Sequence, residues 1–203
     1  MSCGSRLESS DRRRGWWRDL LVLGGGGLFL LACAPAVIFP PEVLEKVHRT
    51  VNFEQVMDHP AQYEGLVVEL GGEILRSMVE GGEVELLVRA LPIQTKPVYG
   101  PVDPGGERGM FIIRYAGQVG DQDLQHGNMI IVIGPMLGAV VTNMTGVPVS
   151  RLMVSAECFH VWRTQGEPIE DYPWPKNVEG FARLVEQTYC INRPNTILNT
   201  TSP

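Results

Sequence analysis

The chain has 203 residues, with 17 lysines and arginines against 23 aspartates and glutamates, which gives a net charge of −6 at pH 7. This length accommodates one domain of ordinary size with extensions. The acidic balance argues against nucleic acid as a partner, because proteins bind phosphate backbones mainly through lysine and arginine side chains.

The first 32 residues have the features of an export signal. Five arginines precede or border an apolar stretch over residues 20–31, which four consecutive glycines interrupt. A membrane-spanning helix needs roughly 20 apolar residues, whereas the core of a signal peptide needs about 7–15. Consecutive glycines also weaken a permanent helix. We therefore predict that residues 1–32 form a signal peptide that is removed.

The apolar stretch ends in Leu30-Leu31-Ala32-Cys33, which resembles the lipobox of bacterial lipoproteins. In such proteins the cysteine receives a diacylglycerol, a peptidase cuts before it, and the new amino group is acylated. The resemblance predicts lipidation of Cys33 and attachment to a membrane, since each buried methylene adds about 0.8 kcal/mol. Ala34 favours the outer membrane, because an aspartate there resembles an inner-membrane retention signal. The alternative is that Cys33 is a buried cysteine in an N-terminal helix.

Cleavage before Cys33 leaves 171 residues with 12 basic and 20 acidic side chains, a net charge of −8. Two further cysteines remain, Cys158 and Cys190. In an oxidising periplasm such a pair is a candidate disulfide. The alternative is one buried thiol and one exposed thiol, and the sequence does not decide between them.

Residues 33–50 are predicted to be a lipidated N-terminus and tether, with three prolines and a short helix over residues 42–49. A helical turn is expected over residues 52–59, ending at Pro60. The following residues alternate between apolar and polar side chains, which predicts half-buried strands. The expected strands cover residues 66–74, 84–91, 110–115, 129–134 with a continuation to 141, and 152–162. Residues 93–108 are rich in proline and glycine and are predicted to form a long surface loop.

Five strands, a glycine-bent first strand and a short insertion between the third and fourth predict a mainly β domain over residues 51–164. We expect a small five-stranded OB-like barrel, which would leave few exposed strand edges. A two-sheet sandwich is the rival architecture. Residues 165–203 are predicted to be a proline-rich extension, a helix from Asn177 to about Tyr189 that packs on the barrel, and a disordered polar tail.

Several short motifs resemble the starvation-inducible outer-membrane lipoprotein (Slp) family. The segment Asp58-His59-Pro60-Ala61-Gln62-Tyr63-Glu64-Gly65, followed by Gly71-Gly72-Glu73-Ile74, is similar to the family's opening. Further similar segments are Ala90-Leu91-Pro92-Ile93, residues 109–115, residues 128–134 and Val161-Trp162. The resemblance covers about residues 50–164 and the lipobox. It implies a lipoprotein of the outer membrane that faces the periplasm, is associated with starvation and has no known catalytic residues.

The sequence offers little catalytic chemistry. The four histidines have no ligand partners at metal-binding spacing, so we expect no metal site and no cofactor. Cys158 and His160 point to the same face of a strand, where a thiol beside an imidazole would be a candidate nucleophile; a core position for both is favoured. A row of acidic side chains is interpreted as a solvated face rather than a docking surface for a basic partner or a cation: Glu69, Glu73, Glu83 and Glu85.

We therefore expect a lipid-anchored, non-enzymatic structural or interaction protein of the cell envelope, with an envelope protein or a cell-wall component as its partner. One alternative is a binding module for a small or polymeric envelope ligand, held on the barrel face beside residues 93–108. The less favoured alternative is a cysteine-dependent enzyme that uses Cys158 and His160.

Overall fold

The structure is a computed structural model that describes residues 38–48, 51, 53–96, 98–143, 146–172 and 184–191. The predicted signal peptide, Cys33, the polar tail and the first part of the predicted C-terminal helix lie outside these residues. Within them, no helix has the length and hydropathy needed to cross a bilayer.

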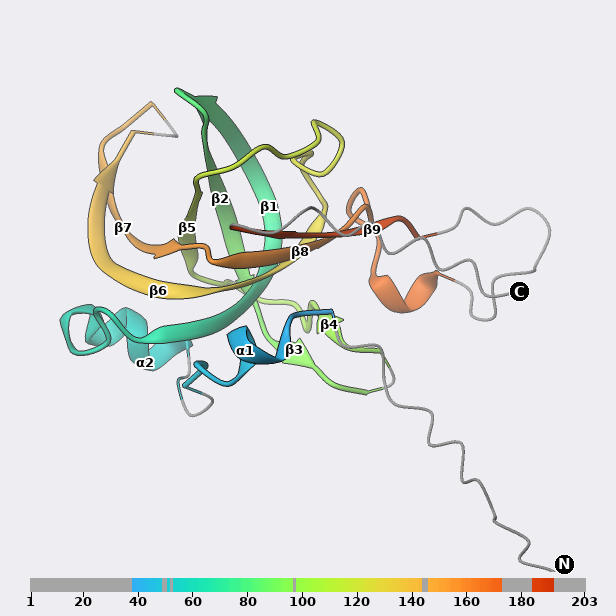
Figure 1. Ribbon diagram of the computed structural model, residues 1–203, viewed down its shortest axis with the longest axis horizontal. Coiled ribbons are helices and arrows are strands. Elements are labelled where there is room, and N and C mark those ends of the chain that lie inside the picture. The colour runs from blue at the N-terminus through green and yellow to red at the C-terminus, as the bar shows by residue number, and fades with distance from the viewer. Residues whose placement is uncertain are drawn as a thin grey trace, which may run out of the picture. The chain divides into compact units, whose positions relative to one another are not determined.

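The described residues form mainly β structure (Figure 1). The two short helices are α1 (Pro41–Leu44) and α2 (Phe53–Asp58), and the two 3₁₀ turns are η1 (Pro60–Gln62) and η2 (Ile169–Asp171). The strands are β1 (Val67–Glu80), β2 (Glu83–Leu91), β3 (Ile93–Gln94), β4 (Gly100–Pro101), β5 (Met110–Tyr115), β6 (Met129–Thr142), β7 (Val149–Ser155), β8 (Cys158–Trp162) and β9 (Glu186–Cys190).

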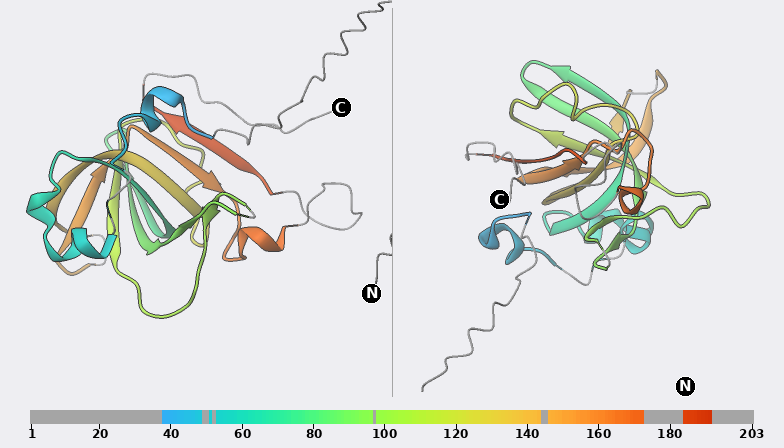
Figure 2. Two further views of the ribbon diagram at one scale, coloured as in Figure 1. Left: turned by 90° about the horizontal axis from the view of Figure 1, so that it is seen from below. Right: turned by 90° about the vertical axis from the view of Figure 1, so that its right-hand side faces the viewer.

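Five strands close into a ring. Strand β1 pairs with β2, β2 with β5, β5 with β7, β7 with β6, and β6 again with β1. The β5–β7 pairing is parallel and the other four are antiparallel. Strands β8 and β9 continue the sheet from β6 outside the ring, and Figure 2 shows β9 beside β8 at the sheet edge. The mainly β prediction is confirmed.

Strand β1 can pair with both β6 and β2 because it is long and bent. Its start pairs with β6 and its end pairs with β2, and both pairings include Gly71 and Gly72. A β carbon at Gly72 would lie 2.3 Å from the carbonyl oxygen of Arg89, so the two backbones approach each other more closely than any other residue permits. A register shift follows between Ile74 and Arg76.

The predicted strand over residues 152–162 is in fact two strands. The backbone of Ser155 crosses directly over Gly134, where a β carbon would lie 1.9 Å from the Ser155 carbonyl oxygen. After this crossing the Ala156 amide donates to Arg114 in β5, and the Glu157 amide donates to Ile133 in β6. The chain thereby changes from pairing inside the ring to pairing outside it.

The ring encloses the main hydrophobic core. Its fully buried side chains come from alternate positions of the strands and include Ile74, Leu86, Phe111, Ile130 and Phe159. A second cluster, the outer layer, packs against the outside of β6 and β8; its buried members are Phe39, Val43, Leu91, Met129, Ile131, Ile133, Cys158, Trp162, Ile169 and Cys190. Strand β6 is therefore buried on both faces in its first half, as its unbroken apolar sequence predicts.

The prediction of a helix that continues to Tyr189 is wrong for its last part. Residues Glu186–Cys190 form strand β9, which pairs antiparallel with β8. In this pairing Tyr189 stacks on Phe159 with ring centroids 5.0 Å apart. Burial of this face against β8 overrides the helical spacing of the preceding apolar residues. Residues 173–183 lie outside the described part of the chain.

Candidate functional site

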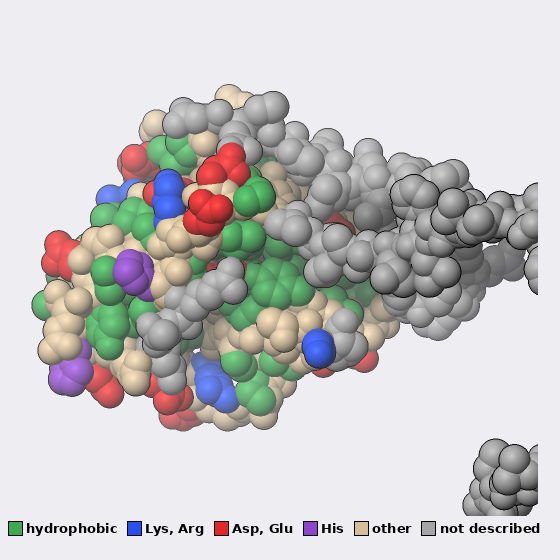
Figure 3. Space-filling model, turned by 60° about the horizontal axis from the view of Figure 1, so that its bottom comes forward, with side chains coloured by type: hydrophobic (Ala, Val, Ile, Leu, Met, Phe, Trp, Pro, Cys, Tyr) green, Lys and Arg blue, Asp and Glu red, His purple; other side chains and the backbone are tan. Residues whose placement is uncertain are grey.

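A cavity of about 610 Å³ opens between α2 and the strands beneath it. Its lining combines three separate segments of the chain: the region of α2, the start of β1, and the end of β2 with both ends of the loop that follows. The lining residues are Val51, Phe53, Glu54, Met57, Asp58, Glu69, Leu70, Gly71, Ala90, Leu91, Pro92, Ile93, Glu107, Arg108 and Gly109. Helices α1 and α2 and strands β3 and β4 lie along the lower side of the ring in Figure 1, and Figure 3 shows hydrophobic side chains between charged ones on that face.

The helix that roofs the cavity is fixed to the ring. Val56 is fully buried in the main core. Phe53 packs on Phe111, with ring centroids 5.7 Å apart. Gly109 makes room for this contact, because a β carbon there would lie 2.7 Å from the Phe53 ring. The roof is thus held in place by core packing and does not depend on a ligand.

The loop on the other side of the cavity, predicted to be irregular, contains a small two-stranded sheet. Strand β3 pairs with β4, and the Val102 amide donates to the Pro92 carbonyl oxygen, 3.0 Å away. Arg89 bridges Glu73 and Asp103. The hydrogen bond from Arg89 lowers the pKa of the Asp103 carboxyl below its usual range. These contacts hold the loop against the strands.

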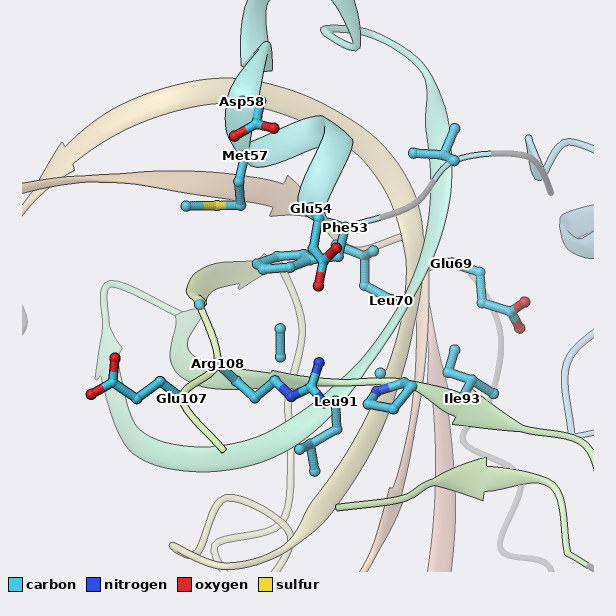
Figure 4. A pocket seen from close by; sticks show the side chains of 15 residues that line it. Phe53, Glu54, Met57, Asp58, Glu69, Leu70, Leu91, Ile93, Glu107 and Arg108 are labelled. Carbon is cyan, nitrogen blue, oxygen red and sulfur yellow. The ribbon is translucent and has the colours of Figure 1, made fainter. Parts of the chain in front are cut away.

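Arg108 places a positive charge in the cavity. Its side chain runs across the opening below Phe53 and Glu54 and above Leu91 (Figure 4). The Nε atom is buried and has no hydrogen-bond partner in the described part of the chain. A guanidinium group is always charged and can only donate hydrogen bonds, so this N–H group calls for an acceptor. The sequence analysis held a ligand site beside this loop as an alternative and did not single out Arg108.

The acidic side chains of the predicted solvated face mostly have partners. Arg89 donates to Glu73, and Arg114 donates to Glu85 with a separation of 2.8 Å. Glu69 accepts a hydrogen bond from the Tyr99 hydroxyl. No group of three or more acidic, histidine or cysteine side chains suited to a metal ion occurs among the described residues.

Cys158 and Cys190 face each other directly across β8 and β9. Their sulfur atoms are bonded, 1.97 Å apart. A cysteine in a disulfide has no thiol, so this arrangement provides no nucleophile next to His160. The His160 ring is fully buried.

The contacts of His160 join neighbouring parts of the fold. Its Nδ1 atom lies 2.7 Å from the Thr188 hydroxyl, and that hydroxyl donates to the Ile38 carbonyl oxygen at 3.1 Å. Because the hydroxyl hydrogen is used on Ile38, Nδ1 must donate to the Thr188 oxygen. The ring also makes an edge contact with Trp162. His160 therefore connects β8, β9 and the N-terminal segment.

A second polar network fixes β9 at its other face. Asp123 is buried and accepts hydrogen bonds from Arg163 at 2.6 Å and from the Tyr189 hydroxyl at 2.6 Å. The Gly120 amide donates to the same hydroxyl. Burial and the bond to Asp123 raise the pKa of Tyr189 to about 12.

A family model of the outer membrane lipoprotein Slp family matches residues 30–193. The match covers most of the chain and includes Cys33, the ring of strands and both Cys158 and Cys190. No curated protein and no solved structure matches the chain.

Proposed function

Because the chain belongs to the outer membrane lipoprotein Slp family, we propose that it is a non-enzymatic lipoprotein, anchored through Cys33 and facing the periplasm. The observation that carries this proposal is that the family match begins at residue 30. The Leu30–Cys33 motif is therefore part of the region that the chain shares with its family, and it follows an apolar stretch of signal-peptide length.

The Cys158–Cys190 disulfide supports an exported destination. Disulfides form and persist in oxidising compartments such as the periplasm and are rare in the cytosol. The two cysteines are directly opposed in the β8–β9 register, so strand pairing itself brings them together. We propose that this disulfide forms in the mature protein.

The N-terminal segment would hold the domain close to the membrane. Phe39 and Val43 are buried in the outer layer, and Lys46 forms an ion pair with Glu157 at 2.8 Å. Four residues lie between Cys33 and Ile38, so five residue steps join them, and an extended chain spans at most about 3.6 Å per residue. The chain that links the proposed lipid anchor to the packed segment is thus at most about 18 Å long.

The ring of five strands is best classed as an OB-like barrel. Its order, β1-β2-β5-β7-β6, returns to β1, with one parallel pairing between β5 and β7. OB-folds are five-stranded Greek-key barrels that bind extended ligands on one face. The second candidate function, a ligand-binding module, is favoured by the cavity beside Arg108.

Localisation tests the proposed function directly. Membranes from cells producing the wild-type chain are separated by density, and intact and permeabilised cells are treated with protease. We expect the protein in the outer-membrane fraction, cleaved only after permeabilisation. Cys33→Ala should release it from that fraction, and Cys3→Ala, in the predicted leader, should not. Recovery of Cys33→Ala in the outer membrane at the wild-type level would contradict lipid anchoring.

A further inference from the structure

The cavity under α2 has the properties of a ligand site. A volume of about 610 Å³ lies within the range of small-molecule pockets, which are concave, largely apolar and preformed. Apolar side chains supply about half of its walls, including Phe53, Leu70, Leu91 and Ile93, and charged side chains supply much of the rest. Met57 at the mouth is 42% exposed. The roof and the floor both belong to the packed domain, so an apolar ligand would find a formed surface.

The guanidinium group of Arg108 favours a negatively charged ligand. The buried Nε–H group of Arg108 lacks an acceptor among the described residues. A carboxylate or phosphate oxygen can accept from Nε and from a terminal nitrogen of the same guanidinium group, in two parallel charge-assisted hydrogen bonds. A neutral oxygen could accept from Nε only without the added attraction of a negative charge, and a cationic group would be repelled.

Four acidic side chains line the cavity together with Arg108, and they disfavour a ligand with more than one negative charge: Glu54, Asp58, Glu69 and Glu107. In Figure 4, Glu107 extends away from Arg108, and Asp58 lies at the far end of α2. The carboxylate of Glu54 points toward the side of the cavity that Arg108 crosses. A multiply charged anion would be repelled by Glu54, whereas a single anionic group can pair with Arg108.

We propose that this cavity binds a monoanionic amphiphile: one carboxylate or phosphodiester group on Arg108 and an apolar chain against Phe53, Leu70 and Leu91. The inference deepens the ligand-binding candidate, and it rests on the proposed membrane anchor only for the source of the ligand. A free fatty acid and an anionic phospholipid share this chemistry. Both would be available to a domain held near a bilayer.

The experiment is calorimetric titration of the lipidated protein in phosphatidylcholine nanodiscs, with empty nanodiscs as the blank. The probes are octanoate, octanol and octylamine, which differ in the charge of the head group, and acetate, which lacks the chain. We expect octanoate to bind at least tenfold more tightly than the other three. Short-chain phosphatidylglycerol, titrated in the same way, distinguishes a phospholipid from a free carboxylate as the preferred source.

Variants inside and outside the cavity test whether octanoate binds there. Arg108→Gln should weaken octanoate binding about tenfold and leave octanol binding unchanged. Arg76→Gln removes the same charge from an exposed position on β1 outside the cavity and should change neither. Glu54→Gln should strengthen octanoate binding severalfold, because it removes a repelling carboxylate. Met57→Asp at the mouth should weaken both probes, and octanoate more than octanol, because the new carboxylate also repels the anionic head group.

Two results would overturn the proposal: octanoate binding no more tightly than octanol, or Arg108→Gln behaving like Arg76→Gln. Circular dichroism of each variant checks that the domain is folded. Anchoring is measured separately by mass, so an unlipidated chain that still bound octanoate would remove the anchor and keep the ligand site.

Discussion

The inside of the ring and the outer layer are both hydrophobic cores, but they are assembled differently. The inner core is filled by alternate residues of the strands themselves. The outer layer combines side chains from the N-terminal segment, from the end of β2, from β8 and from β9. Alternation within one strand predicts the first kind of core. The second kind depends on segments that are far apart in sequence.

Strands β8 and β9 also carry the specific crosslinks of the fold. The disulfide joins β8 to β9, and the Thr188 hydroxyl connects His160 to Ile38. Arg163 and Tyr189 share the carboxylate of Asp123 on the other face of β9. Elements at the edge of a sheet open more readily than a central core, so we expect these contacts to hold β9 and the N-terminal segment against β8.

The largest expected loss of stability follows from a substitution in the main core, and a matched substitution in the outer layer should cost less. Phe159→Ala should lower the free energy of unfolding by about 3–5 kcal/mol, as for other buried phenylalanines, because Phe159 is fully buried between Tyr115 and Tyr189. Phe39→Ala should cost less, since the N-terminal segment can detach without opening the ring. Urea denaturation measures both. Equal losses would show that the outer layer unfolds together with the ring.

Removal of the disulfide should have the next largest effect. Cys158→Ser with Cys190→Ser is expected to lower the free energy of unfolding by about 2–4 kcal/mol, because the unfolded chain gains conformational freedom. Hydrogen exchange should increase most at β9 amides, while β1 and β6 remain protected. Uniform loss of protection across the ring would contradict a peripheral role for this crosslink.

Tyr189 predicts a pH dependence at the alkaline end. Its folded-state pKa of about 12 lies above the ordinary value near 10, so its contribution to stability is complete below pH 10 and is lost between pH 10 and 12. The loss should be roughly 2 kcal/mol. Tyr189→Phe should reduce this dependence, leaving the part due to Tyr115, whose pKa burial also raises. Melting temperatures from pH 8 to 12 provide the measurement. An unchanged slope in Tyr189→Phe would contradict the assignment.

The smallest effect is expected at the exposed ion pair between Lys46 and Glu157. Lys46→Ala should cost less than about 1 kcal/mol, since exposed pairs are weakened by solvent and salt. Denaturation at low and high salt would show the difference shrinking as salt rises. A larger, salt-independent loss would mean that Lys46 packs as well as pairs.

The sequence predicted the elements whose pattern is local. The alternation of β2, β5 and β6 and the helical turn at α2 were identified within a few residues of their observed bounds, whereas β1 continues six residues beyond its predicted end. Two features depended on distant contacts and were missed: the division between β7 and β8, which follows from the crossing at Gly134, and strand β9, which requires β8 as its partner. The small β3–β4 sheet was missed as well, although its strands lie close together in the sequence.

The candidate site, too, was only partly predictable from local sequence patterns. The alternative ligand site was placed beside the proline- and glycine-rich loop, because such loops often border sites, and both ends of this loop line the cavity. Arg108 was not identified, since its role depends on α2, which lies more than forty residues earlier and roofs the cavity only in the folded chain. Nothing in the local sequence distinguishes a buried Nε–H group from an exposed arginine.

The most direct test of the lipoprotein assignment is the intact mass of the protein extracted from membranes. We expect a mature chain that begins at Cys33, carries the added mass of acyl chains, and loses two hydrogens to the Cys158–Cys190 disulfide. Cys33→Ala should lack both the cleavage and the lipid. An unprocessed wild-type chain, or one cut at another residue without added lipid, would contradict lipid anchoring at Cys33.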